Sequence, residues 1–528
     1  MPDQFSNLQQ IRKPAVSSKG GIVAAQSRKA AEIGAAVLAA GGDCVDAVIA
    51  TSFALGVLEP WMSGVGGGGA MVLYRAKDDR CEVIDFGTRA PLSLRVEDYP
   101  LTGGAASDIF PWPRVKDDRN IHGPGSIAVP GVVAGMEEAH RRHAKLPWRE
   151  LLGPSVTLAA EGLLVDWWTE HMIASAAADL RRYPASAAAY LQDGLPPNPQ
   201  WGIRTVVRLP QDKLKATLAH LASQGPRDFY QGDLAKSIAA DVTASGGALS
   251  VEDLTAFRAH LREPLVIPYR GGRVYATPEL TCGPTLAHAL RLLQTNLQPG
   301  RDPDASAYAD YVLALQSAYR ERLQGMGDAD GRRALGAEHL APSCTTHFSI
   351  VDRDGNMAAV TQTLLSGFGS KFVTPHSGIT MNNGIMWFDP TPGTPNSLAP
   401  GKRCLTNYTP VVAQAGDGRR LALGASGGRR ILPAVTQLLS FAMDFRMDLD
   451  AAIHQPRIDA SEGAIVIGDM RLPGEVREAL RRRFDYEEAR VQTIPGKFAC
   501  PSVVLRNGTT NSGAADPAQP WADAVAEG

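Results

Sequence analysis

Two threonines that a predicted hairpin brings together are the residues best suited to carry chemistry in this chain. Residues 346–352 and 356–363 have the composition of two strands separated by a polar turn centred near Asp354. In a hairpin folded symmetrically about that turn, Thr345 lies opposite Thr363. Directly opposed residues are about 4.5–5.5 Å apart at Cβ, so the two hydroxyls can hydrogen-bond. The pattern predicts a nucleophile and its orienting partner where the first strand begins.

The assignment of Thr345 as a nucleophile depends on a cut in the chain just before it. A cut between Cys344 and Thr345 would place a free α-amine beside the Thr345 hydroxyl, and a threonine activated by its own amine is an established nucleophile–base pair. The reference pKa of an α-amine is about 7.7–8.0, so a substantial fraction is neutral near neutral pH and can act as the base. We expect Cys344 to be the last residue before the cut, because no His and Asn motif supports it as a thiol nucleophile.

A glycine-rich junction is the second candidate. The segment Gly424-Ala-Ser-Gly-Gly-Arg-Arg430 follows a predicted strand and opens a predicted helix. Backbone N–H groups at such a junction converge and favour negative charge, which suits a tetrahedral oxyanion. A bound phosphate, or no ligand, would suit the junction equally well when it is taken alone. Together with the Thr345 hairpin, it is interpreted as an oxyanion hole.

Further charged residues have a chemical and a structural interpretation. His347 points to the same face of its strand as Thr345, but about 6–7 Å further along, and a structural histidine fits at least as well as a general base. Arg89, Arg429 and Arg430 are candidates for a carboxylate clamp. For any one of them, a surface or structural ion pair is the commoner role.

Composition excludes several classes of protein. The 528 residues are 44% hydrophobic and carry a net charge of -2, so we expect a large core and no nucleic-acid partner. The six cysteines are scattered without a CxxC pair, which predicts free thiols and neither a disulfide framework nor a metal site. Residues 64–69 match GxGxxG, but the predicted order of helix, glycines and strand is the reverse of a dinucleotide site. No organic cofactor is expected.

The chain has no recognisable leader and no apolar stretch of about 18 residues for a membrane span. We therefore expect a cytoplasmic protein without a membrane partner.

Hydrophobic periodicity and turn signals outline helices that pack around antiparallel strands, an α+β architecture in layers. Residues 326–343 look like an exposed connector, and the last twenty residues look frayed. The predicted helices are residues 26–40, 43–58, 130–144, 150–162, 211–224, 230–245, 251–258, 284–295, 305–325, 430–443 and 474–483. The predicted strands are residues 71–74, 272–277, 346–352, 356–363, 378–382, 408–414 and 419–424.

Taken together, these motifs resemble the γ-glutamyltranspeptidase family of N-terminal-nucleophile hydrolases over nearly the whole chain. The motifs that carry the resemblance are Gly41-Gly-Asp-Cys-Val-Asp-Ala47, Gly66-Gly-Gly-Gly-Ala70, Asp85-Phe-Gly-Thr-Arg-Ala-Pro91, Val129-Pro-Gly-Val-Val-Ala-Gly135, Gly246-Gly-Ala-Leu-Ser-Val-Glu-Asp-Leu254, Thr345-Thr-His-Phe-Ser-Ile-Val-Asp352, Asn382-Asn383, Gly401-Lys-Arg403 and Gly424-Ala-Ser-Gly-Gly428.

The resemblance implies a proenzyme that cuts itself into two subunits, a large one of residues 1–344 and a small one of residues 345–528. Together they would build one four-layer αββα sandwich, and two such heterodimers could pair. The large and small subunits would then be partners derived from the same precursor.

The resemblance also implies roles for individual residues. Thr345 would be the nucleophile both of the autoprocessing step and of catalysis, and Thr363 would assist it by hydrogen bonding. Gly427 and Gly428 would supply the oxyanion hole. No metal or cofactor is implied.

The departures from the family pattern concern the groups that hold a glutamyl substrate. The arginine that follows Asp-Phe in that family is Gly87 here, although Arg89 stands two residues later. The asparagine two residues after Thr363 is replaced by Leu365, and the aspartate that grips the glutamyl amino group is replaced by Trp387. A buried substrate ammonium without its carboxylate partner would cost several kcal/mol.

Two further differences lie near the implied oxyanion hole. The family's paired serines become Thr406 and Asn407, and the segment between Trp387 and Lys402 is too short for the long lid loop of many bacterial members. The candidate substrate-binding residues are Arg89, Trp387, Thr406, Asn407, Arg429 and Arg430.

These features predict a self-cleaving threonine amidohydrolase that acts on a small amide whose acyl group lacks an α-amino group. The chain is similar to the branch of the family that includes oxamate amidohydrolase of purine and urate breakdown, so oxamate is the favoured substrate. The alternative is a γ-glutamyl hydrolase or transferase, acting on glutathione-like amides with a clamp rebuilt from other residues. A non-catalytic binding protein would leave the chain intact and would not depend on Thr345.

Overall fold

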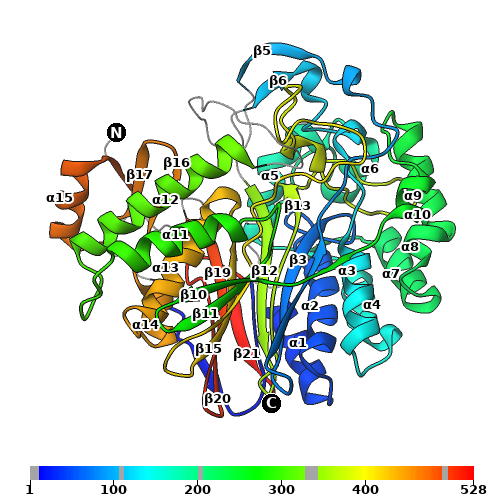
Figure 1. The fold of residues 1–528 in the computed structure, drawn as a ribbon. Helices are drawn as coiled ribbons and strands as arrows, with labels where there is room; N and C mark the ends of the chain where they lie inside the picture. The colour runs from blue at the N-terminus through cyan, green and yellow to red at the C-terminus, as the bar shows by residue number, and fades with distance from the viewer. Residues whose placement is uncertain (1–10, 106–111, 200–205, 327–342, 490–497) are drawn as a thin grey trace.

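The protein is built around two seven-stranded sheets that face each other, with helices on both outer sides (Figure 1). The computed structural model describes residues 11–105, 112–199, 206–326, 343–489 and 498–528. The first sheet contains, in spatial order, β21 (Asp523–Ala526), β2 (Ile22–Ala25), β12 (Ser343–Val351), β13 (Met357–Ser366), β3 (Gly68–Arg75), β4 (Arg80–Phe86) and β9 (His260–Arg262). The second contains β1 (Val16–Ser18), β20 (Thr510–Ala515), β19 (Cys500–Asn507), β15 (Arg420–Ser426), β14 (Val411–Gln414), β11 (Gly272–Ala276) and β10 (Leu265–Tyr269).

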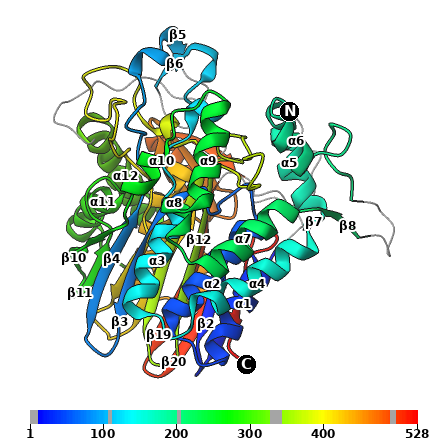
Figure 2. The same cartoon turned by 90° about the vertical axis from the view of Figure 1, so that its right-hand side faces the viewer.

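Helices form the two outer layers, and Figure 2 shows α2, α4 and α7 side by side over the first sheet. That layer consists of α1 (Arg28–Ala39), α2 (Cys44–Leu58), α3 (Val132–His143), α4 (Trp148–Glu161), α7 (Asp212–Gln224), α8 (Asp228–Gln231), α9 (Asp233–Ala244) and α10 (Val251–Ala256). The other consists of α11 (Gly283–Asn296), α12 (Ala305–Gly325), α13 (Ile431–Met443), α14 (Leu449–His454) and α15 (Gly474–Arg483).

Smaller elements lie outside the two main sheets. They are β16 (Ile458–Glu462), β17 (Ile465–Asp469) and β18 (Asp485–Ala489) in one sheet, the ribbon of β5 (Leu101–Ala105) and β6 (Pro113–Val115), and the ribbon of β7 (Leu163–Val165) and β8 (Val207–Leu209) beside α5 (Trp167–Leu180) and α6 (Pro184–Tyr190).

The core has three layers because the strands of the inner sheets are covered on both faces. On β13, Ala358 and Val360 pack with the helices of the first layer, whereas Met357 and Ala359 pack between the two sheets. This alternation follows from the two-residue period of a strand. All ten residues of β13 are buried, including the polar residues Thr361, Gln362, Thr363 and Ser366. The α+β, four-layer αββα prediction is confirmed.

Local signals set the ends of several elements. Asp43 caps α2 by accepting a hydrogen bond from Val45 N at 2.8 Å, and the Asp46 carboxylate accepts one from Asp43 N at 2.8 Å. The glycine run before β3 is a tight turn. A Cβ on Gly67 would lie 2.3 Å from the carbonyl oxygen of Thr363, so only glycine allows this turn to approach β13 so closely.

Two predictions were wrong, one about a strand and one about the C-terminal segment. Residues 378–382 form no strand and make only one isolated bridge, Val373 with Thr380, because hydrogen bonds from Asn382 and its neighbours fold this segment against the glycine turn. The C-terminal residues are not frayed: β21 pairs with β2, with Ile22 opposite Ala526. An edge position in the sheet orders this segment, although its composition resembles that of a tail. The predicted connector of 326–343 lies, apart from its ends, outside the described residues.

The described helices include none with the length and hydropathy needed to cross a bilayer. Within the same ranges, three or more His, Cys, Asp or Glu side chains do not come together as a metal site.

Glu59, which follows α2, provides a test of the buried architecture. Its side chain is fully buried, neither carboxylate oxygen has a hydrogen-bond partner in the described residues, and burial raises its pKa from 4.5 to about 8. The native state therefore keeps a proton that the unfolded chain releases, and the free energy of unfolding falls by up to about 1.4 kcal/mol per pH unit as the pH rises from about 5 to 8. We expect Glu59→Gln to remove this loss, as measured by urea unfolding across that range.

The matched control is Glu150→Gln, because Glu150 is exposed near the start of α4. It should leave the pH dependence unchanged. A Glu59→Gln variant whose stability falls with pH as steeply as that of the wild type would contradict the prediction.

Candidate active site

The predicted hairpin of β12 and β13 is present, with the predicted register as far as the residue after the nucleophile. Antiparallel pairing runs from Val351 opposite Met357 to Thr346 opposite Gln362. This is the symmetry expected for a turn centred near Asp354. Thr345 itself lies in a β-bulge, where the register shifts by one residue.

The two threonine hydroxyls meet at this bulge. Cys344 pairs with Leu365 on the far side of it, so Thr363 and Leu364 both lie opposite the single residue Thr345. The Thr345 hydroxyl donates to the Thr363 hydroxyl at 3.4 Å. Bulges redirect side chains and are enriched beside active sites.

The Thr363 hydroxyl is the centre of this arrangement. It donates a hydrogen bond to the carbonyl oxygen of Cys344 and accepts one from Leu365 N at 2.8 Å. The Cys344 carbonyl belongs to the peptide bond that precedes Thr345. Thr345 and Thr363 are at most 1% exposed, so these interactions lie in a site screened from water, where hydrogen bonds are electrostatically stronger.

The strand period directs this site toward the second sheet. Thr345, His347 and Ser349 alternate with Phe348 and Ile350, which pack under the helices of the first layer. The first three therefore face the inter-sheet layer, and the Ser349 hydroxyl donates to a carbonyl of β19 at 3.0 Å. The nucleophile candidate thus points toward the strands that lead to the glycine junction.

The glycine junction follows β15 and needs its glycines. Gly427 and Gly428 have φ angles of 135° and 58°, a region that side chains disfavour. A Cβ on Gly427 would lie 2.9 Å from Ala499 Cα. The short helical turn η5 (Gly428–Arg430) lies against β12 and leads directly into α13. Two predicted pieces of the site, the Thr345 strand and the glycine junction, are therefore neighbours in space.

His347 has the structural role. Its ring is fully buried, with Nδ1 2.9 Å from the Thr361 hydroxyl and Nε2 3.0 Å from the Ser349 hydroxyl. Burial lowers its pKa to about 3, so it is neutral at physiological pH. Both ring nitrogens are engaged, and the general-base alternative loses its support.

The three arginine candidates differ in their surroundings. Arg89 is half-buried after β4, and its guanidinium makes no hydrogen bond or ion pair with another described residue. Arg429 and Arg430 act on the fully buried Asp459: burial raises the pKa of that carboxyl, and the two guanidinium charges oppose the rise. Arg429 and Arg430 thus lie near enough to this buried carboxyl for their charges to affect its pKa.

Trp387 and Leu365 sit in one apolar cluster. Trp387 ends the short helix η4 (Gly384–Trp387), is 1% exposed, and lies 6.2 Å from the Tyr408 ring, measured between centroids. Leu365, directly opposite Cys344, packs in the same cluster with Cys404. Two positions that would hold polar groups in a glutamyl pocket are therefore apolar and buried, in a cluster that reaches the residue opposite Cys344.

The paired asparagines brace the loops around β13. The Asn382 amide nitrogen donates to the carbonyls of Gly66 and Ala128 at 2.8 Å each. The Asn383 amide nitrogen donates to the Ser366 hydroxyl at 2.7 Å. These contacts tie the glycine turn and the end of β13 together.

Sequence reasoning missed two side chains of α12, Tyr319 and Arg322, which are 4% and 1% exposed. Both touch the loops that carry the candidate substrate-binding residues. Nothing in the helical pattern of residues 305–325 separates a buried arginine from one on a solvated face.

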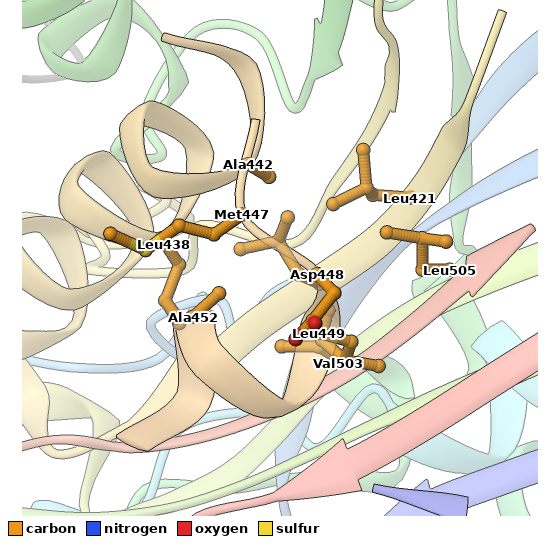
Figure 3. A pocket seen from close by; sticks show the side chains of 10 residues that line it. Leu421, Leu438, Ala442, Met447, Asp448, Leu449, Ala452, Val503 and Leu505 are labelled. Carbon is orange, nitrogen blue, oxygen red and sulfur yellow. The ribbon is translucent and has the colours of Figure 1, made fainter. Parts of the chain in front are cut away.

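The cavity drawn in Figure 3 lies apart from these residues, between α13, α14 and the second sheet. Its one charged lining residue, Asp448, caps α14 by accepting from Ala451 N at 2.8 Å. An aliphatic space with its only carboxylate engaged is a packing defect rather than a substrate site. Its lining residues are Leu421, Leu423, Leu438, Ala442, Met447, Asp448, Leu449, Ala452, Val503 and Leu505.

Known proteins resemble this chain along almost its full length. A family model for gamma-glutamyltranspeptidase matches residues 30–343 and 332–526. Acylase ACY 1 proenzyme of Pseudomonas sp. (strain V22) is 34% identical over 502 residues, covering 89% of this chain and 88% of the relative. Glutathione hydrolase proenzyme of Bacillus subtilis (strain 168) is 29% identical over 493 residues, covering 83% of this chain and 80% of the relative.

The fold comparison agrees. The crystal structure of cephalosporin acylase from Bacillus halodurans superposes with a TM-score of 0.84 at 25% identity, covering 100% of this chain and 99% of that structure. The family model spans both sides of Thr345, and the sheets, the hairpin and the glycine junction occur in one continuous architecture. This chain belongs to the gamma-glutamyltranspeptidase family.

Proposed function

We propose that the chain is a proenzyme that cuts itself before Thr345 and then hydrolyses amides with Thr345 as the nucleophile. The observation that carries this proposal is the Thr363 hydroxyl, which binds both the Thr345 hydroxyl and the Cys344 carbonyl oxygen. The Thr363 hydroxyl thus links the Thr345 hydroxyl, which attacks, to the Cys344 carbonyl group, which is attacked. Relatives on both sides of the family, an acylase and a glutathione hydrolase, are proenzymes, which supports a division into subunits of residues 1–344 and 345–528.

In the autoprocessing step, the Thr345 oxygen attacks the carbonyl carbon of Cys344. Negative charge develops on the carbonyl oxygen, where the Thr363 hydroxyl already donates a hydrogen bond. The C–N bond then breaks and its nitrogen takes up a proton, which leaves an ester on the Thr345 oxygen and a free α-amine on the same residue. Water hydrolyses the ester and releases the Cys344 carboxylate.

In catalysis, the neutral amine of Thr345 accepts the proton of its own hydroxyl while the oxygen attacks the substrate carbonyl. The N–H groups of Gly427 and Gly428 stabilise the oxyanion. The amine then protonates the leaving nitrogen, and ammonia or an amine departs. Water resolves the acyl-enzyme; an amine in its place would give acyl transfer.

The pocket favours an acyl group that has a carboxylate and lacks an α-ammonium. Leu365 and Trp387 offer no carboxylate to an ammonium group, and burying an ammonium without an acidic partner costs several kcal/mol. Arg89, whose guanidinium has no described acidic partner, can serve a carboxylate. The likeness to an acylase proenzyme supports this class. Oxamate is the smallest substrate of this class, and a γ-glutamyl amide is the alternative substrate.

Two amides that differ only in the α-ammonium test this specificity: glutaryl-p-nitroanilide and γ-glutamyl-p-nitroanilide. We expect kcat/KM to favour the first by at least about tenfold, because only the second must bury an ammonium. Ammonia release from oxamate, compared with that from longer ω-carboxyl amides, then gives the preferred chain length. A preference for the γ-glutamyl compound would establish the alternative instead.

Thr345→Ala should leave one full-length, inactive chain, because both steps need the hydroxyl. Intact mass spectrometry and a denaturing gel measure the cut. The control is Thr346→Val, which removes a buried hydroxyl that has no hydrogen-bond partner in the described structure; it should be cut and remain active. Two fragments from Thr345→Ala would refute the assignment.

Thr363→Val should slow the autoprocessing cut by about 10²–10³-fold, the usual effect of removing one donor to a developing oxyanion. A time course of the freshly purified precursor on a gel measures the rate. Thr361→Val is the matched control on the same strand, since its hydroxyl contacts His347 rather than the scissile peptide. Equal cutting rates for Thr363→Val and the wild type would remove Thr363 from the mechanism.

A further inference from the structure

One face of α12 reaches two loops of the candidate site. The Tyr319 hydroxyl donates to the carbonyl oxygen of Arg429, next to the glycine junction. Arg322 lies three residues later, hence on the same helix face, and donates to the carbonyl oxygen of Thr406. Figure 1 shows α12 beside α11 in the helical layer over the second sheet. A helix of the proposed large subunit therefore holds two loops of the proposed small one.

Arg322 is a buried cation whose partners are neutral. It is 1% exposed and donates to Thr281 O at 2.9 Å and to the Thr285 hydroxyl at 3.4 Å. No ion pair joins it to an acidic side chain of the described residues. A buried charge that is hydrogen-bonded but not neutralised leaves a positive potential around it. The charge of Arg322 acts on the neighbouring Cys282 thiol: burial raises the pKa of this thiol, and the Arg322 charge opposes the rise.

Arg322 also decides which way the Asn407 amide points. A guanidinium can only donate hydrogen bonds, so the oxygen of Asn407 faces Arg322, with Oδ1 3.4 Å from Nη2. The amide nitrogen is then the free end. Asn407 is 1% exposed, and its Nδ2 has no hydrogen-bond partner in the described structure. Asn407 precedes Tyr408, whose ring packs against Trp387 in the apolar wall.

We propose that Arg322 is a positioning and specificity residue: it presents the Asn407 amide nitrogen to a carboxylate oxygen of the acyl group and supplies the positive potential that retains it. This rests on the proposed amidohydrolase function and deepens it. A substrate carboxylate satisfies both the unused amide donor of Asn407 and the unneutralised charge of Arg322. An ammonium at the same place would meet a donor and a like charge.

Two p-nitroanilides of similar length test the proposal, glutaryl with a carboxylate and pentanoyl without one. The readout is the ratio of their kcat/KM values in the cut enzyme. We expect Arg322→Met to lower the glutaryl-to-pentanoyl ratio by at least about tenfold, with the loss in the glutaryl KM. A purely structural role would instead impair both substrates equally, which would overturn the proposal.

Asn407→Asp separates charge from packing. The new carboxylate lies beside Arg322, neutralises it and removes the amide donor, so the melting temperature should rise while the glutaryl-to-pentanoyl ratio falls. This variant keeps the proposal falsifiable if Arg322→Met fails to fold. An unchanged ratio in Asn407→Asp would refute the role of Arg322 in specificity.

Two further variants complete the design. Tyr319→Phe removes the contact to the glycine junction and should lower kcat for both substrates without changing the ratio. Arg419→Met is the matched control: this arginine also donates to backbone carbonyls, those of Ala442 and Met447 at 2.8 and 3.1 Å, but at the far end of β15. It should leave the ratio at the wild-type value. A Tyr319→Phe or Arg419→Met variant that changes the ratio as Arg322→Met does would count against the proposal.

The experiments distinguish a failure of the proposed function from a failure of the inference about Arg322. A wild-type chain that stays uncut, or that hydrolyses neither anilide nor oxamate, would reject the proposed function. A cut, active enzyme whose ratio is insensitive to Arg322→Met and Asn407→Asp would reject only the inference about Arg322.

Discussion

The candidate site depends on a single hydroxyl, that of Thr363. It binds the Thr345 hydroxyl and the Cys344 carbonyl oxygen at the same time, at a β-bulge that sets two residues of β13 against one of β12. The local irregularity is held by its surroundings, because every residue of β13 is buried between helices and a second sheet. The reactive geometry is thus stabilised by packing on both faces of the strand.

The sandwich supplies that packing and also brings the glycine junction to the nucleophile. Because side chains alternate along β12, one face of the strand packs against the helices of the first layer. The other face, which carries Thr345, points toward the second sheet. The end of β15 then places Gly427 and Gly428 against β12. Glycines recur where backbones approach most closely: a side chain at Gly67 would overlap a carbonyl of β13, and one at Gly427 would overlap Ala499. Close backbone approach at these points is what lets the separate elements form one site.

The chemistry of the pocket wall sets this chain apart from a glutamyl-binding pattern. Apolar side chains, Leu365 and Trp387, share one buried cluster, and Leu365 lies opposite Cys344. Within the described residues, the guanidinium groups of Arg89, after β4, and of Arg322, beneath the loop of Asn407, form no ion pair with a carboxylate. Apolar walls with unneutralised positive charge suit an acyl group that ends in a carboxylate.

Much of this was accessible from the order of residues alone. The hairpin register, the glycine junction, most helices and the layered α+β class follow from local periodicity, turn composition and spacing, which act over a few neighbouring residues. The bulge at Thr345 was not predictable, because it reflects competition between strand pairing and the packing of distant elements. Nor was the pairing of β21 with β2, since composition does not encode which sheet edge is left open. The buried state of His347, and the position of Arg322 behind Asn407, were decided only in three dimensions. Whether a titratable side chain is solvated, paired or isolated depends on segments far apart in the chain, so burial rather than residue type sets its charge and its partners.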